Sequence, residues 1–359
     1  MIKFHYATLD DKARIDELLH NSNERGCEYS FTNLFAWSAP YQLQVASVEG
    51  CLTTHMTGVI GPCYLYPVGG DTKAAILALA QDAAERGEPL RLGCLSAERR
   101  DELESFFPGC FEFNEDRDGF DYLYDIQRLA TLTGKKLHGK RNHINKFLAE
   151  YPDWSTEPIT MDNLAECLKM NDAWHRENEG YDGEDTFEED GDALIKSMAH
   201  YEQMGLDGLL LRAGGKVVAF TMGEQMGAED TYDVHFEKAF AEVPGAYPMI
   251  NREFARWVQE HYPEVRYLNR EDDMGVEGLR QAKKSYYPDL LLEKYSAVLK
   301  KEILQLKSLL FPYEAAGFFL LSLYRQSYTW GRKSYFPFFF PSSMIVVKSS
   351  ETIQFGGTL

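Results

Sequence analysis

The sequence lacks the short motifs that mark several well-known chemistries. Its six cysteines form no CxxC pair, which excludes a zinc ribbon or a thioredoxin-like centre and predicts reduced thiols. The first half contains no GxGxxG or GxxxxGK phosphate loop and no GxSxG nucleophile elbow. The acidic stretch at residues 176–192 does not have the spacing of a calcium loop. We therefore expect no metal, and a reaction without a covalent enzyme intermediate.

Long hydrophobic runs are also missing. Residues 1–19 become charged early and lack the apolar centre of a secretory signal. No stretch before Lys300 approaches the roughly 18 apolar residues that a membrane span needs. These absences predict a cytoplasmic protein without integral membrane contact.

Basic residues are scarce relative to acidic ones. The chain has 37 Lys and Arg against 56 Asp and Glu, which gives a formal charge of -19. Such a charge disfavours unspecific binding of nucleic acid or anionic membranes by the whole surface. It still allows a local basic patch.

One basic segment interrupts this acidic chain at residues 135–146. Its basic and histidine side chains are Lys135, Lys136, His138, Lys140, Arg141, His143 and Lys146, with no acidic residue among them. Two interpretations stay open at this point. The segment is either a solvated helix with Ile144 and Phe147 packed inward, or a site for the phosphates of a cofactor or of an RNA acceptor arm.

Length and periodicity predict two domains. A chain of 359 residues exceeds what one core usually fills. Strand-like and helix-like segments alternate in a mixed α/β order, and a short strand followed by an amphipathic helix occurs both at residues 2–19 and at residues 154–177. We expect one domain at residues 1–128 and a second at residues 129–300.

The last part of the chain, residues 301–359, has a different composition. It carries six basic and three acidic residues, whereas 31 basic and 53 acidic residues precede it. Its apolar run at residues 334–347 is interrupted by Pro337 and Pro341 and is too short to span a bilayer. We expect an appended, poorly ordered tail.

The strand expected at residues 230–240 carries three titratable side chains at alternate positions. Alternation places Asp233, His235 and Glu237 on one face of the strand. Acyl or aminoacyl transfer needs a base for the acceptor proton and donors for the oxyanion. We predict His235 as that base, oriented by Asp233 or Glu237, against the alternative of a structural histidine. Glu271, in the loop after the next strand, is a second candidate.

Two segments carry a resemblance to a known family. They are LTGKKLHGKRNHINKF at residues 132–147 and LNREDDMGVEGLRQAKKSYYP at residues 268–288. They are similar to a bacterial family of mostly uncharacterised proteins, which is related to the C-terminal domain of phosphatidylglycerol lysyltransferase and, more distantly, to the peptidoglycan aminoacyltransferases of the Fem type. The similarity extends over about residues 1–298.

The resemblance implies a fold class and a place for the donor. The fold would be mixed α/β, with two tandem acetyltransferase-like (GNAT-type) domains, each a mixed β-sheet flanked by helices. In such domains a glycine-containing turn and the next helix N-terminus bind a phosphate, which points to Gly245 and Ala246. The chain has Glu242 where acetyltransferases usually carry Arg or Gln. That departure weakens the case for acetyl-CoA.

The resemblance also implies roles for the basic segment near the end of the second domain. Tyr287 or Tyr286 would donate a proton or stack on an adenine base. The candidates for phosphate contact are Arg280, Lys283, Lys284, Lys140 and Arg141. The alternative for this segment is a short helix with surface lysines.

These observations predict an acyl or aminoacyl transferase that acts by direct transfer. Its donor substrate would be an acyl-CoA or an aminoacyl-tRNA, and charged tRNA is the expected macromolecular partner in the second case. Its acceptor would be an amine or hydroxyl of a small molecule or peptide. The alternative is a non-catalytic binding or regulatory protein that keeps the fold.

Overall fold

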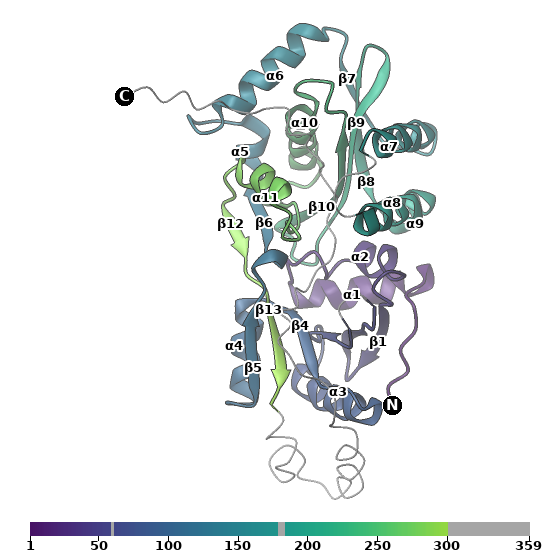
Figure 1. Ribbon diagram of the computed structural model, residues 1–359, viewed down its shortest axis with the longest axis vertical. Helices are drawn as coiled ribbons and strands as arrows, with labels where there is room; N and C mark the ends of the chain where they lie inside the picture. Colours follow the sequence, from purple (N-terminus) through teal and green to yellow (C-terminus); the bar gives the residue numbers. More distant parts are fainter. Residues whose placement is uncertain (59–60, 179–183, 301–359) are drawn as a thin grey trace, which may run out of the picture.

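The computed structural model describes residues 1–58, 61–178 and 184–300 (Figure 1). The tail expected at residues 301–359 lies outside the described residues. Two larger sheets lie one above the other in the view of Figure 1, with helices packed on both. The prediction of a mixed α/β fold with mixed sheets is confirmed.

The first third of the chain alternates short strands with helices. Its elements are η1 (Leu9–Asp11), α1 (Lys12–Ser22), α2 (Phe31–Ala36), β1 (Gln44–Val48), β2 (Cys51–His55), β3 (Tyr64–Leu65), α3 (Thr72–Arg86), β4 (Arg91–Leu95), α4 (Ala97–Phe106), β5 (Phe111–Glu115), η2 (Arg117–Gly119) and β6 (Asp121–Asp125). The strand expected at residues 2–6 is reduced to a single bridge between His5 and Val45.

The rest of the described chain begins with helices and continues into a strand meander. Its elements are α5 (Ile126–Thr131), α6 (His138–Glu150), β7 (Ser155–Pro158), α7 (Leu164–Asn178), α8 (Glu184–Ala199), α9 (Tyr201–Met204), β8 (Asp207–Ala213), β9 (Lys216–Gln225), β10 (Thr231–Ala239), α10 (Ala246–His261), β11 (Tyr267–Asn269), α11 (Glu277–Lys284), β12 (Leu290–Leu292) and β13 (Tyr295–Leu299).

Helix starts follow the local capping chemistry. The side chain of Ser30 accepts a hydrogen bond from the Asn33 backbone and begins α2, and Asp71 does the same for α3. These contacts satisfy amide groups that have no partner inside the first turn. Gly87, in the left-handed conformation, ends α3.

The two larger sheets exchange strands across residue 129. The seven-stranded sheet has the order β12-β6-β11-β10-β9-β8-β7, and the four-stranded sheet has the order β3-β4-β13-β5. Strand β6 from the first third therefore belongs to the larger sheet, and the last strand, β13, belongs to the smaller one (Figure 1). The domain boundary between residues 128 and 129 stays a prediction.

Two hydrophobic cores lie on opposite faces of the larger sheet. Helices α5, α6 and α10 enclose one core with Phe147, Ile250 and Phe254. Helices α7 and α8 cover the other face, and their core continues into the smaller sheet and α2. Helix α2 contacts Glu224 of β9 and Glu271 in the loop after β11.

Candidate functional site

Strand β10, which carries the predicted base, contains a β-bulge. Asp233 pairs with Glu224 and Val234 with Gly223 of β9, but the next pair is Phe236 with Met222, so His235 is the extra residue. A Cβ atom at Gly223 would lie 2.0 Å from the Asp233 carbonyl oxygen. Glycine is therefore required opposite the bulge.

The bulge changes which face each later side chain occupies. Asp233 and His235 face the junction with α2, whereas Glu237 contacts Asn251 of α10 at 3.2 Å and Arg270 at 2.8 Å. The expectation that Asp233, His235 and Glu237 share one face is wrong for Glu237. One inserted residue shifts the strand's period of two.

His235 lies among three carboxyl groups, which together form the His235 cluster (Glu224, Asp233, His235 and Glu271). Its Nδ1 is 3.1 Å from Glu271 Oε1 and 3.6 Å from Asp233 Oδ2, and its Nε2 is 3.1 Å from Glu224 Oε1. The structure thus brings together the three predicted residues Asp233, His235 and Glu271. Their catalytic roles stay a prediction.

The second-candidate base, Glu271, is held by its loop in an unusual backbone conformation. Its φ of 55° lies in the left-handed region, where a side chain is strained. The Asn269 side chain accepts the Glu271 backbone N–H at 2.7 Å, and Asn33 Nδ2 donates to Glu271 Oε1 at 3.1 Å. These contacts turn the carboxylate inward toward β10.

The His235 cluster is closed to solvent. Asp233 is 0% exposed, His235 2% and Glu271 1%. Burial, followed by the charge of Glu271, raises the pKa of Asp233 well above its ordinary value. Burial opposes protonation of His235, but Asp233, Glu224 and Glu271 outweigh it and raise the pKa of the imidazole well above its ordinary value. Because they are buried, these side chains do not contact solvent, from which an acceptor substrate would arrive.

A second buried group of charges lies nearby, the Lys294 cluster (Cys27, Glu28, Asp121 and Lys294). Lys294 Nζ is 2.6 Å from Asp121 Oδ1 and 2.7 Å from Glu28 Oε2. Asp121 Oδ2 also accepts the Cys27 backbone N–H and the Asn269 side chain, both at 2.9 Å. Burial, opposed by Lys294, raises the pKa of the Cys27 thiol well above its ordinary value.

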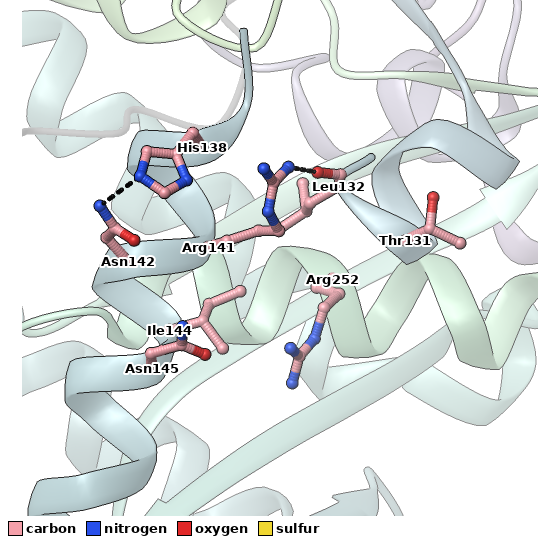
Figure 2. A pocket seen from close by; sticks show the side chains of 8 residues that line it. All are labelled: Thr131, Leu132, His138, Arg141, Asn142, Ile144, Asn145 and Arg252. Atoms are coloured by element: carbon pink, nitrogen blue, oxygen red, sulfur yellow. Dashed lines mark hydrogen bonds between the residues drawn. The ribbon is translucent and has the colours of Figure 1, made fainter. Parts of the chain in front are cut away.

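The basic segment at residues 135–146 covers the turn before α6 and the first two thirds of that helix. Ile144 and Phe147 are buried as expected, and the histidine and lysine side chains point outward or sit on aromatic rings. A pocket of about 200 Å³ opens between α5, α6 and α10 (Figure 2). The side chains that line it are Thr131, Leu132, His138, Arg141, Asn142, Ile144, Asn145 and Arg252, and none is acidic.

The two arginines of this pocket come from different helices. Arg141 of α6 donates to the backbone carbonyls of Leu132 and Gly134, which leaves its charge uncompensated by these partners (Figure 2). Arg252 of α10 pairs with Glu253 at 2.7 Å, and partial burial lowers its pKa. Sequence reasoning identified Arg141 but missed Arg252, because only the packing of α10 on α6 brings it here.

The two predicted basic segments meet at a pair of tyrosines. Lys140 Nζ lies 4.0 Å from the ring centre of Tyr286, and Lys136 Nζ lies 5.1 Å from that of Tyr287. Tyr286 is buried, whereas Tyr287 is 42% exposed and Lys284 is exposed beside it in sequence. We call Lys136, Lys140, Lys284 and Tyr287 the basic surface.

Two predicted phosphate contacts lie elsewhere. Lys283 is 1% exposed and its Nζ donates to the carbonyls of Arg270 and Asp272, so a phosphate role finds no support in this position. Arg280 is paired with Asp273 at 2.6 Å and also with Asp118. Leu279 and Lys283 share one face of α11 at a spacing of four, so burial of the leucine carries the lysine inward.

The predicted donor turn begins α10 and packs against α6. Gly245 has a φ of 90°, and a Cβ there would lie 2.4 Å from the His143 carbonyl oxygen. Ala246 follows as the first residue of the helix and is 1% exposed. The turn therefore requires glycine for both its conformation and its contact with α6.

Comparison with solved structures confirms the fold. A conserved protein of unknown function from Bacteroides thetaiotaomicron VPI-5482 is 41% identical, with a TM-score of 0.78 over 84% of this chain and all of that one. L-PGS from Bacillus licheniformis is 16% identical, with a TM-score of 0.59 over 84% of this chain and 95% of that one. FemX is 10% identical, with a TM-score of 0.55 over 85% of this chain and 99% of that one. The chain thus shares its mixed α/β fold with L-PGS and FemX, as the Fem-type resemblance predicted.

Sequence comparison also finds a curated relative and a family model that match this chain. An uncharacterised protein from Mycoplasmoides gallisepticum is 23% identical over 180 residues, and the aligned part spans about half of that relative, 54% of its length. Within the described residues, none of the helices is both long and apolar enough to cross a bilayer. The profile described as "Phosphatidylglycerol lysyltransferase, C-terminal" matches residues 20–298. The chain therefore belongs to the phosphatidylglycerol lysyltransferase C-terminal family.

Proposed function

We propose that this protein transfers an aminoacyl group from a charged tRNA to an amine or hydroxyl acceptor. The observation that carries the proposal is the contact of Lys136 and Lys140 with Tyr287 and Tyr286, the tyrosines just after α11, which brings a basic segment against a distant part of an otherwise acidic protein. Lysines with an exposed aromatic ring suit phosphates and an unpaired base at the end of an RNA. Membership in a family named for a lysyltransferase, and the fold shared with L-PGS and FemX, support the same class.

The pocket beside the basic surface fits the same donor. Its eight lining residues include Arg141, His138 and two asparagines, and none of the eight is acidic, although Arg252 pairs with Glu253 outside the lining (Figure 2). A volume of about 200 Å³ suits a small polar group rather than a whole nucleotide. We infer that it takes one phosphate or the polar end of the donor.

The proposed chemistry is a direct transfer. The acceptor nitrogen or oxygen attacks the ester carbonyl of the aminoacyl-tRNA, a new amide or ester bond forms, and the bond to the ribose oxygen breaks. The acceptor gives up a proton and the tRNA hydroxyl takes one. An acyl-CoA donor is less well supported, because Glu242 stands where Arg or Gln is usual and α6 packs against the Gly245 turn.

The test is binding of charged tRNA, measured by fluorescence anisotropy at several salt concentrations. The variant Lys136→Glu/Lys284→Glu should weaken binding at least tenfold and flatten the salt dependence. The control Lys3→Glu/Lys216→Glu makes the same charge change at two exposed lysines outside the basic surface and should bind nearly as wild type. Equal losses in both variants, or no binding by the wild type, would reject the proposal, and acetyl-CoA binding without tRNA binding would favour the acyl-CoA donor.

The burial of the His235 cluster favours a second candidate, a non-catalytic binding protein. Its predicted base does not reach solvent in this structure. Incubation with radiolabelled aminoacyl-tRNA and a panel of amines separates the two candidates. Tight tRNA binding without label transfer, under conditions in which a related transferase transfers it, would support the binding protein.

A further inference from the structure

The His235 cluster contains more acid than base. Three carboxyl groups surround one imidazole, and among the described residues none of the three forms an ion pair with Lys or Arg. All four side chains are buried. Uncompensated buried carboxylates cost several kcal/mol each, so the cluster needs further positive charge or bound protons.

Asp233 points into this cluster without a hydrogen-bond donor. Within the described part of the chain, neither of its carboxylate oxygens accepts a hydrogen bond, although the residue is 0% exposed. His235 Nδ1 lies 3.6 Å from its Oδ2, and a carboxylate oxygen of Glu271 lies within 4.8 Å. Buried carboxylates without a partner are rare in folded proteins, and a bound ion is one of the ways to satisfy them.

The spacing of the cluster suits a metal ion. One atom each of Asp233, His235 and Glu271 lies within 4.8 Å of the others. A metal with ligand bonds near 2.1 Å separates neighbouring ligand atoms by about 3.0 to 3.4 Å. The distances of 3.1 and 3.6 Å from His235 Nδ1 to Glu271 and Asp233 are close to that range.

The fourth member of the cluster orients the imidazole. With the proton on Nε2, the ring donates to Glu224 Oε1 at 3.1 Å and turns the Nδ1 lone pair toward Asp233 and Glu271. Glu224 is itself fixed by the Thr32 backbone N–H, at 3.2 Å. A carboxylate on the far nitrogen is the usual support of a metal-binding histidine.

Contrary to the expectation of no metal from sequence motifs, we propose that Asp233, His235 and Glu271 bind one first-row divalent cation, such as Mn²⁺ or Zn²⁺, between β10 and the loop after β11. One imidazole nitrogen and two carboxylates suit these ions, whereas Mg²⁺ keeps several waters that a closed site does not admit. The ion neutralises the carboxylates and ties strand β10 to the strained Glu271. Its role is structural, because the cluster does not face solvent.

The nearby Lys294 cluster provides the internal control. Cys27, Glu28 and Asp121 also lie within 4.8 Å of one another, but the ammonium of Lys294 already occupies the position between the two carboxylates. A cation there would meet the repulsion of Lys294. The proposal therefore assigns the ion to one cluster and excludes it from the other.

The test is elemental analysis of the full, tag-free chain after dialysis against EDTA and re-equilibration with Mn²⁺ or Zn²⁺. We expect about one ion per chain in the wild type and in Cys27→Ser, and at least a tenfold loss of bound metal in Asp233→Asn and Glu271→Gln. Circular dichroism checks that each variant is folded. Binding of neither ion by the wild type, or metal content unchanged in both cluster variants, would overturn the proposal.

Substitution with Co²⁺ keeps the test decisive where a variant does not fold. Co²⁺ bound by one nitrogen and two carboxylates gives weak visible bands only. A strong thiolate charge-transfer band would place the ion at Cys27 and contradict the assignment. Failure of this proposal leaves the tRNA proposal unaffected, because the basic surface contributes no ligand to the cluster.

Discussion

The Lys294 cluster and the His235 cluster lie side by side between the two sheets and differ in their cation. Asn33 joins them, since its Nδ2 donates to the Cys27 carbonyl at 2.7 Å and to Glu271 at 3.1 Å. In the first cluster an ammonium reaches both carboxylates within 2.7 Å. In the second, a single imidazole stands among three carboxyl groups.

This difference shows how a buried acidic group becomes tolerable. An ammonium between two carboxylates is a permanent counter-charge that the chain itself supplies. A histidine among carboxylates either stays protonated or shares the site with an external cation. The region between the two sheets thus holds two kinds of buried acidic cluster. The Lys294 cluster contains its own cation, whereas the His235 cluster needs protons or a cation from solution.

The largest expected effect is on the Lys294 cluster. Lys294→Met keeps the length of the side chain but leaves Asp121 and Glu28 buried without their ammonium. We expect a loss of about 3 to 5 kcal/mol in the free energy of unfolding, measured by urea denaturation. Lys294 comes directly before β13 and the exposed Lys300 directly after it. The control Lys300→Met should change the free energy of unfolding by less than about 0.5 kcal/mol. A loss below about 1 kcal/mol in Lys294→Met would show that this pair does not hold the junction.

A second prediction concerns the response of the His235 cluster to metal and pH. A fixed concentration of free Mn²⁺ or Zn²⁺, equal to 100 times the Kd measured at neutral pH, should add about 2.7 kcal/mol of stability at that pH. Protons compete for the imidazole and the carboxylates, so binding releases protons and the gain grows as the pH rises from about 5.5 to 8. Thermal unfolding with and without metal at several pH values measures it. A gain that is constant with pH, or that is largest at low pH, contradicts metal binding by these side chains.

The third prediction concerns Glu224, the support of the imidazole. Glu224→Gln keeps an oxygen near His235 Nε2 but removes its charge. We expect metal affinity to fall by about 10-fold, or about 1.4 kcal/mol, in competition with a chelating dye. Gln225→Glu, a change of charge at the next position of the same strand, is the control and should leave the affinity within about twofold. Unchanged affinity in Glu224→Gln would remove Glu224 from the site.

Much of the fold could be predicted from local patterns. The periodicity of the sequence predicted helix α1 within residues 2–19, helix α7 within residues 154–177 and strand β10 within residues 230–240, to within a few residues. The inward packing of Ile144 and Phe147 on α6 also followed from spacing alone. What such patterns do not contain is the exchange of β6 and β13, since strand pairing over long sequence separations leaves no local signal.

The candidate site was predictable only in part, for the same reason. Asp233, His235 and Glu271 were chosen as titratable residues on or after adjacent strands, and they do meet. Glu224 was missed because its place depends on the pairing of β9 with β10. The predicted face of Glu237 was wrong because strict alternation along a strand does not allow for a single-residue bulge.

The smallest effect is expected at Cys27, and it sharpens the comparison. Its Sγ lies 3.4 Å from Asp121 Oδ1 and 3.5 Å from Lys294 Nζ, inside a cluster in which Lys294 already pairs with both carboxylates. A hydroxyl donates to the same carboxylate and fills slightly less space, so Cys27→Ser should alter stability by less than about 1 kcal/mol. Metal content should also stay at the wild-type value, because the ammonium and not the thiol decides that no cation enters here. Loss of metal in Cys27→Ser, measured alongside urea denaturation, would mean that the two clusters share one ion and are not independent sites.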